Sequence, residues 1–372
     1  MTDYNFATLD LALQLFLQDQ VPVPQTFNAT INKQDEMYLF ALQNHKFPEK
    51  ARIRYHFNGQ RIFDAVRQVV QWKFQGFNSI HSFLDFASGY GRFTRFLLQE
   101  LNPQQVWISD IYENAVKFQQ DTFGVHGILS TVNPADYQLN QTFDCILACS
   151  FFSHIPEKTF TNWMKTLYNL LTPEGILLFS VHDRDLLPPE SQIQSDQLLF
   201  IPQSESLSLD FNEYGTSYVG EVFVRKIVEN ISHGEAFCYR ISKGICRYQD
   251  LYLIGKQPTP EFSDLDFGHH PWGRLEYINL DSEGILTLKG SVSELNDQSK
   301  IEKILVSING DLVQQIKPNL NPDSTSEYSW SMQINVPNLS AQDVILIKAI
   351  NSKGLEWVFE AAPLEILQTA MM

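Results

Sequence analysis

The sequence has few cysteines for its length, four in 372 residues. This number is too small for a disulfide framework, so we expect reduced thiols, as in the cytosol. Cys145 and Cys149 are spaced to share one face of a strand, and free cysteines are among the most buried residues. Because Cys238 and Cys246 do not form a second pair with metal-ligand spacing, the sequence predicts no metal site.

Basic residues are also scarce, with 27 Lys and Arg against 43 Asp and Glu and a formal net charge of -16. Such a charge repels phosphate backbones, so we expect no nucleic-acid partner and favour a small molecule or neutral sugar. No apolar run approaches the roughly 18 residues of a membrane span. Acids such as Asp3 and Asp10 occur where a signal peptide begins with basic residues. We therefore expect a cytoplasmic protein without a membrane partner.

Residues 1–80 read as an N-terminal helical lead-in. Its clearest helix is QRIFDAVRQVVQWKFQG, residues 60–76, in which Ile62, Phe63, Val66 and Val70 recur at helical spacing before Gly76 ends the run.

Residues 81–257 alternate short apolar runs with helical patterns. Strand, helix and strand in succession indicate a parallel sheet with right-handed crossovers, a doubly wound Rossmann-like α/β fold. The last part, residues 236–256, reads as two strands joined at Ser242–Gly244, an antiparallel edge.

The composition changes in KQPTPEFSDLDFGHHPWG, residues 256–273, where prolines, acids and glycines without a period indicate a linker. Residues 274–366 then alternate apolar and polar positions between turns, with Asn309-Gly310 as a hairpin signature. This pattern predicts a C-terminal all-β domain, an Ig-like sandwich.

A cofactor site is indicated by FLDFASGYGRF, residues 83–93, where two glycines follow an apolar strand. Gly89 and Gly91 allow a tight turn and close approach of a nucleoside to the backbone. Asp110 ends the next apolar run, about 20 residues on, where such sheets bind ribose hydroxyls. A dinucleotide site needs a small third residue where Thr94 stands. Asp85 would also repel a pyrophosphate but attract a cationic sulfonium.

Three stretches resemble the motifs of class I S-adenosylmethionine-dependent methyltransferases: LDFASGYGRFTRFL, WISDIYENAV and residues 143–182. The resemblance implies S-adenosylmethionine as cofactor. The family's acid after the third strand has no match here, and Thr131 and Asn133 lie nearest that position. The cofactor-binding residues that the resemblance implies are Asp85, Ala87, Ser88, Gly89, Gly91, Asp110, Ile111, Thr131, Asn133 and Ser150.

The acceptor is expected beyond the fourth and fifth strands. Methyl transfer needs donor and acceptor to be oriented, and a hydroxyl acceptor also needs a base, for which histidine is suited. His154 follows the fourth strand and His182 ends the fifth, so both are candidate catalytic residues. We expect Phe151, Phe152 and Tyr214 to line the substrate pocket, with the long polar segment after His182 as a lid.

The sequence lacks the D-P-P-Y or N-P-P-Y segment that the resemblance would imply for planar nitrogen acceptors, and it lacks a Pro-Cys nucleophile. Oxygen methylation of a small molecule or sugar is therefore favoured. The β region resembles accessory sandwiches of bacterial glycosyltransferases and methyltransferases, which raises a glycan acceptor and makes Trp272, Trp330 and Trp357 candidate stacking platforms. The alternatives are a non-catalytic scaffold with this fold or a nicotinamide-dependent oxidoreductase.

Overall fold

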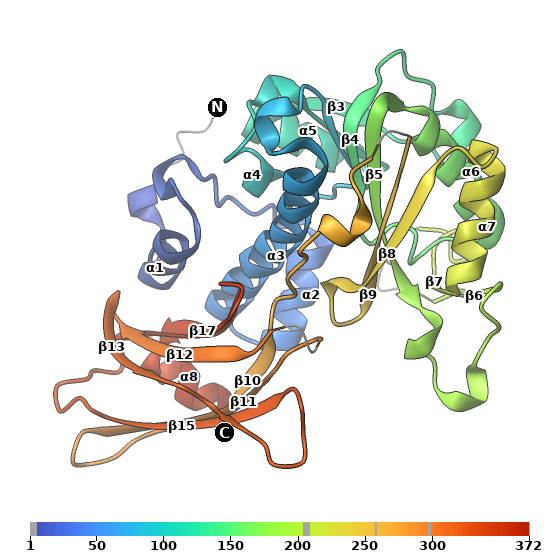
Figure 1. The fold of residues 1–372 in the computed structure, drawn as a ribbon. Helices are drawn as coiled ribbons and strands as arrows, with labels where there is room; N and C mark the ends of the chain where they lie inside the picture. Colours follow the sequence, from blue (N-terminus) through green and yellow to red (C-terminus); the bar gives the residue numbers. More distant parts are fainter. Residues whose placement is uncertain (1–5, 204–208, 257–258, 297–298, 372) are drawn as a thin grey trace. The chain divides into compact units, whose positions relative to one another are not determined.

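The structure is a computed structural model that describes residues 6–203, 209–256, 259–296 and 299–371 (Figure 1). Its internal contacts divide the chain into two units. The sheet unit contains residues 34–36 and 60–267, and the sandwich unit contains residues 3–33, 37–59 and 268–372. The expected domain boundaries, at 1–80, 81–257 and 274–366, stay a prediction about which parts fold independently.

The sheet unit is built on parallel strands in the order β3-β2-β1-β4-β5, and β9 pairs antiparallel with β5 and carries β8 on its far side. The order reverses between β1 and β4, which confirms the doubly wound sheet and puts the switch point beside β1. These strands are β1 Phe83–Phe86, β2 Val106–Asp110, β3 His126–Leu129, β4 Phe143–Ala148, β5 Leu171–Asp183, β8 Phe237–Cys246 and β9 Gln249–Gly255.

Helices α6 (Glu157–Asn169) and α7 (Glu221–Ser232) lie together against one face of this sheet (Figure 1). In α6, Phe160, Trp163 and Leu167 recur at helical spacing, and they join a core with the inward side chains of β4, β5 and β9. Full burial of one such side chain stabilises the fold by about 1.5–3 kcal/mol. The apolar stripe therefore determines which side of α6 packs against the sheet.

Helix α5 (Glu113–Phe123) packs on β2 and β3, and the second part of the long helix α3 (Pro48–Phe74) contacts α4 (Thr94–Leu97). The Phe63 ring of α3 stacks on Phe77 at 5.8 Å and on Phe96 at 6.5 Å. The helix predicted for residues 60–76 is therefore present and ends just before Gly76.

One predicted turn is wrong. Strand β8 continues through Ser242–Gly244, and the hairpin to β9 turns at Arg247 and Tyr248 instead. Lys243 has a φ of 54° inside an irregular part of the β8–β9 ladder, where its N–H donates to the Asp250 carboxylate at 2.8 Å. A bulge therefore produced the residue pattern that resembled a turn.

A second pair of strands extends the sheet beyond the end of β5. Strands β6 (Leu198–Ile201) and β7 (Thr216–Val219) are antiparallel, and β7 runs parallel to the last residues of β5. In this register His182 lies beside Tyr218, so the segment between β5 and α7 returns to the carboxyl edge of the sheet.

The sandwich unit has two antiparallel sheets, in the orders β10-β11-β15-β14 and β13-β12-β16-β17, which confirms the predicted all-β region. Asn309 and Gly310 both have positive φ and join β12 to β13, as predicted. Its elements are β10 Trp272–Leu280, β11 Ile285–Ser293, β12 Ile301–Ile308, β13 Asp311–Ile316, β14 Asn319–Leu320, β15 Glu327–Asn335, β16 Val344–Asn351, β17 Glu356–Pro363 and α8 Leu364–Met371.

The tryptophans of this unit are mainly core residues. The Trp330 ring on β15 lies 5.3 Å from Phe359 on β17 and thus joins the two sheets. Trp357 is also buried, and half-buried Trp272 packs on it at 4.6 Å. Because Trp330 and Trp357 are covered, they offer no open face for a sugar ring in this structure.

The N-terminal helices belong to the sandwich unit by their contacts. Helix α1 (Leu11–Gln20) packs on β16 and β17, and Lys348 of β16 bonds to Asp19 at 2.7 Å and to Glu356 at 3.0 Å. The first part of α3 adds an ion pair between Lys50 and Glu360 at 2.8 Å. Helix α2 (Glu36–His45) lies between these segments in the sequence. Among the described residues, no helix has both the length and the apolarity to cross a bilayer.

We expect Lys348→Met to lower the free energy of unfolding of the sandwich unit by about 1.5–3 kcal/mol, the usual contribution of hydrogen bonds to a charged group. The substitution leaves Asp19 and Glu356 facing each other without their shared cation. Exposed Lys303, on β12 of the same sheet, gives the control Lys303→Met, which should change stability by no more than about 0.5 kcal/mol. Urea denaturation measures both, and equal losses would contradict the stabilising role of the two ion pairs of Lys348.

Candidate functional site

The glycine loop after β1 has the conformation that its sequence suggests. Ala87, Gly89 and Gly91 have φ values of 56°, 55° and 79°. A Cβ atom built on Gly89 would meet nothing within 4 Å, whereas one on Gly91 would lie 2.6 Å from the Phe123 ring. Gly89 therefore faces open space that a ligand could fill, and Gly91 is needed for close packing of the loop against α5.

Asp110 joins this loop to the next strand. Its Oδ2 accepts the Gly89 N–H at 2.8 Å, and its Oδ1 accepts the Tyr112 N–H at 3.0 Å. Burial raises the pKa of Asp110, while these backbone bonds favour its charged form. The structure therefore places Asp110 against the glycine loop, and its ribose contact stays a prediction.

Two buried side chains that the sequence interpretation missed also hold the loop. Gln119 of α5 donates through Nε2 to Ser88 Oγ and to the Gly89 carbonyl, both at 2.8 Å. Arg95 donates through Nε to the Gly91 carbonyl at 2.9 Å, and its guanidinium lies over the Phe123 ring. Arg95 is 1% exposed, so its charged side chain lies inside the fold and not in solvent.

The sequence contained a sign of Gln119. It occupies the apolar stripe of α5 with Ala115, Val116 and Phe123, where a polar residue is unusual. No comparable sign exists for Arg95, because α4 has only four residues and its buried face cannot be read from a period.

Asp85 is the second acid of the site, and it is almost fully buried. Its Oδ2 accepts the Thr94 hydroxyl at 2.7 Å. Burial raises the pKa of Asp85 to about 7, the Thr94 hydrogen bond opposes the rise and the nearby Asp110 carboxylate adds to it. Thr94 stands at the position where a dinucleotide site needs a small residue, and its role here is to donate a hydrogen bond to Asp85.

The remaining predicted cofactor residues lie at the ends of the neighbouring strands. Half-buried Ile111 follows β2 directly. Thr131 and Asn133 follow β3, where Asn133 caps the short turn that begins at Pro134. Ser150 follows β4 with a φ of 56°. The carboxyl ends of parallel strands meet at one edge, so these residues and the glycine loop share that edge of the sheet.

The acceptor-side candidates come together beyond β4 and β5. The His154 and Tyr214 rings stack at 5.0 Å with 14° between their planes, and the His182 ring lies 5.9 Å from His154. His154 Nδ1 is 2.7 Å from the Gly215 carbonyl oxygen, which can only accept. Nδ1 therefore carries the proton, and Nε2 of the neutral ring keeps its lone pair.

The segment that carries Tyr214 is bonded to the loop that carries His154. The Gly215 N–H donates to the His154 carbonyl at 2.7 Å, and the Ser217 N–H donates to the Ser153 carbonyl at 2.8 Å. Part of the predicted lid, residues 204–208, lies outside the described residues.

The two phenylalanines after β4, Phe151 and Phe152, differ in burial. Half-buried Phe151 packs against Phe86 at 5.0 Å. Phe152 is fully buried, against Phe160 at 4.7 Å and Phe179 at 5.0 Å, so it belongs to the core in this structure and not to an open wall.

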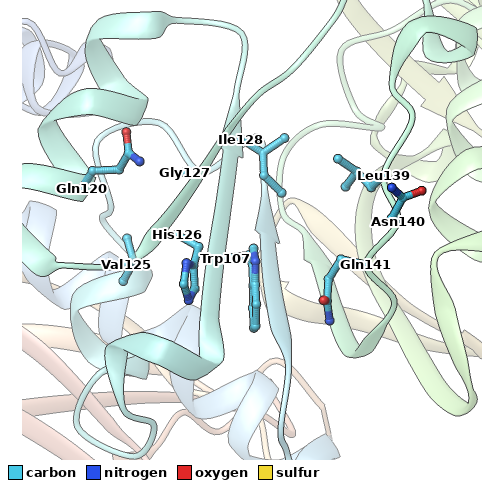
Figure 2. A pocket seen from close by; sticks show the side chains of 9 residues that line it. All are labelled: Trp107, Gln120, Val125, His126, Gly127, Ile128, Leu139, Asn140 and Gln141. Atoms are coloured by element: carbon cyan, nitrogen blue, oxygen red, sulfur yellow. The ribbon is translucent and has the colours of Figure 1, made fainter.

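A separate pocket of about 500 Å³ lies beside the starts of β2 and β3 (Figure 2). Within it the rings of Trp107 and His126 stack at 4.6 Å. The connection from β3 to β4 contains only a short 3-10 turn, Pro134–Asp136, which leaves this sheet edge open. None of the predicted site residues lines the pocket. Its lining residues are Trp107, Gln120, Val125, His126, Gly127, Ile128, Leu139, Asn140 and Gln141.

Comparison with known proteins identifies the central part of the chain. A family model described as a methyltransferase domain matches residues 84–177. Malonyl-[acyl-carrier protein] O-methyltransferase from Calditerrivibrio nitroreducens is 22% identical over 208 residues, which cover 56% of this chain and 75% of that protein. The protein of the same name from Porphyromonas gingivalis is 26% identical over 162 residues, which cover 43% of this chain and 58% of that protein.

Among solved structures, an S-adenosylmethionine-dependent methyltransferase from Clostridium acetobutylicum is 16% identical, with a TM-score of 0.39 over 54% of this chain and 92% of that one. The family match confirms what the three sequence motifs predicted. Residues 84–177 therefore match a methyltransferase domain.

The raised pKa of Asp85 predicts a pH dependence of stability. Between pH 3.8, the ordinary pKa of an aspartate, and about pH 7, folded Asp85 holds a proton that the unfolded chain has released. Stability from the protonated form is therefore complete below about pH 4 and is lost as the pH rises to about 7, at roughly 1.4 kcal/mol per pKa unit. Urea denaturation at pH 5 and pH 8 should show a larger loss for the wild type than for Asp85→Asn.

Exposed Asp121 on α5 gives the control, since Asp121→Asn should keep the wild-type difference between the two pH values. If Asp85→Asn lost as much stability between pH 5 and pH 8 as the wild type, Asp85 would not be the group that titrates.

Proposed function

We propose that this chain transfers a methyl group from S-adenosylmethionine to a hydroxyl oxygen of a small molecule or sugar, with His154 as the base. The observation that carries the proposal is the His154–Gly215 hydrogen bond, which leaves Nε2 as a proton acceptor beside His182 and Tyr214. His154 follows β4, His182 is the last residue but one of β5, and Tyr214 stands just before β7, at the carboxyl edge of the sheet that also holds the glycine loop.

The residues of that edge fit the donor. The positive φ values of Ala87 and Gly89 and the open space at Gly89 leave room for a ligand against the backbone. The Asp85 and Asp110 carboxyls suit a cationic ligand better than a pyrophosphate. When bound, S-adenosylmethionine supplies an electrophilic methyl group on its sulfonium. Asp85, Ser88, Gly89 and Asp110 would hold it, and the contacts of Ile111, Thr131, Asn133 and Ser150 are part of this proposal.

The chain's own contribution is orientation and removal of one proton. His154 cannot rotate without losing its bond to Gly215, and Tyr214 covers one face of its ring. A hydroxyl placed at Nε2 would pass its proton to that nitrogen while the oxygen bonds to the methyl carbon. The carbon–sulfur bond would break at the same time, with its electron pair left on the sulfur of neutral S-adenosylhomocysteine. His182 stands close enough to orient the same hydroxyl or to hold a bridging water.

A carboxylate acceptor is the second candidate. Two relatives are named malonyl-[acyl-carrier protein] O-methyltransferases, which supports oxygen as the acceptor atom. An ionised carboxylate has no proton to lose, so His154 would then only position the acceptor. A scaffold that lost its chemistry and a nicotinamide-dependent oxidoreductase remain the alternatives outside this class.

We expect S-adenosylhomocysteine to bind and to raise the melting temperature as its concentration passes the dissociation constant. Gly89→Val should abolish this binding, because the new side chain fills the space in front of the loop. Gly234 has a φ of 82° and also nothing within 4 Å of a built Cβ, so Gly234→Val carries the same backbone strain away from the site and should bind normally. Calorimetric titration compares the three proteins.

No binding by the wild type at millimolar S-adenosylhomocysteine would contradict the proposed function, and a shift with NADH instead would favour the oxidoreductase. Normal binding by Gly89→Val would mean that the loop does not face the donor.

His154→Gln tests the acceptor class. For a hydroxyl acceptor, loss of a general base should lower kcat by about 10²- to 10⁴-fold and leave S-adenosylhomocysteine affinity unchanged. For a carboxylate acceptor, kcat should fall only a few-fold. Release of S-adenosylhomocysteine over a panel of monosaccharides, other alcohols and carboxylic acids measures turnover, and His233→Gln, at the exposed end of α7, is the matched control.

A further inference from the structure

Two residues other than glycine adopt left-handed backbone conformations at the carboxyl edge of the sheet. Ala87 follows β1 and Ser150 follows β4 by two residues, each with a φ of 56°, and β1 and β4 are neighbours. This conformation is unfavourable for residues with a Cβ atom, so it persists only where surrounding contacts enforce it. For Ser150 those contacts can be identified.

Ser150 is held by a closed ring of hydrogen bonds. Its N–H donates to Ser180 Oγ on β5 at 2.7 Å. Ser180 Oγ in turn donates to Gln249 Oε1 at 2.9 Å, and Gln249 Nε2 donates to Ser150 Oγ at 2.9 Å. Ser180 is fully buried and Gln249 is 9% exposed. Both the backbone and the side chain of Ser150 are therefore fixed.

Gln249 reaches this ring from a distant part of the chain. It is the first residue of β9, which is antiparallel to β5, so it stands level with the carboxyl end of β5. It lies outside the matched domain, residues 84–177. A buried carboxamide costs desolvation unless it is hydrogen-bonded, so the bonds to Ser150 and Ser180 are what offset the burial of Gln249.

The conformation of Ser150 sets the direction in which the chain leaves β4. The next four residues form a tight turn, closed by the His154 N–H that donates to the Phe151 carbonyl at 3.0 Å. A change at Ser150 would therefore move the start of this turn and, with it, the His154 ring.

We propose that Gln249 is a positioning residue that holds Ser150 in its left-handed conformation and so places the turn that carries His154. The catalytic part of this inference rests on the proposed function. The structural part, the dependence of the Ser150 backbone on Gln249, does not.

Glycine provides the test, because it adopts a φ of 56° without a Cβ penalty. Gln249→Leu should lower kcat about tenfold in the wild-type background, with KM for the donor changed less. In the Ser150→Gly background the same substitution should lower kcat less than twofold, whatever Ser150→Gly does by itself. An equal effect of Gln249→Leu in both backgrounds overturns the proposal, because the substitution would then act without Ser150.

Urea denaturation of the same four proteins separates this inference from the proposed function. Gln249→Leu should lower the midpoint clearly with serine at position 150 and much less in the Ser150→Gly background. Additive midpoint shifts overturn the inference even if the protein is an active methyltransferase. If no variant binds S-adenosylhomocysteine, the proposed function fails and the coupling of the midpoints still decides the role of Gln249.

Ser180→Ala is the second variant, in case Gln249→Leu does not fold. It removes the acceptor of the Ser150 N–H with a smaller change in volume. Its effect on kcat and on the urea midpoint should likewise be smaller in the Ser150→Gly background. An equal effect in both backgrounds would mean that the ring of hydrogen bonds does not keep Ser150 in its left-handed conformation.

Discussion

The hydrogen bond from the Gly89 amide to the Asp110 carboxylate is the contact on which the site depends. It joins the loop after β1 to the end of β2, next to the switch point between β1 and β4. Gln119 and Arg95 then hold the carbonyl oxygens of the same loop, so its backbone groups have fixed directions before any ligand arrives. A loop ordered in advance loses little conformational freedom on binding, which favours affinity.

Much of the fold could be predicted because its rules are local. The apolar runs and helical periods of residues 81–257 indicate a doubly wound sheet, and Asn309-Gly310 indicates a hairpin. The turn assigned to Ser242–Gly244 was wrong because a bulge and a turn use the same residue types. The sequence could not show that the first 59 residues group mainly with the C-terminal strands, since such contacts leave no local pattern.

The candidate site also has a part that could be predicted from the sequence and a part that could not. Asp85, Gly89 and Asp110 stand at the ends of recognisable strands, so their meeting follows from the topology. The meeting of His154 with Tyr214 depends on the long excursion between β5 and α7, whose course no period reveals. Gln249 was missed because its partners lie 69 and 99 positions away in the sequence, and Arg95 was missed because the four-residue helix α4 shows no period. Only the folded chain shows that their polar groups are buried.

The ion pair between Lys348 and Asp19 joins residues 329 positions apart in the sequence. A ribosome that adds about 5–20 residues per second would finish α1 well before it makes β16. During that interval Leu13, Phe16 and Leu17, which are buried in the folded protein, have no sheet to cover them. The nascent chain therefore exposes an apolar helix for tens of seconds, a period in which a chaperone can bind it and in which aggregation competes with folding.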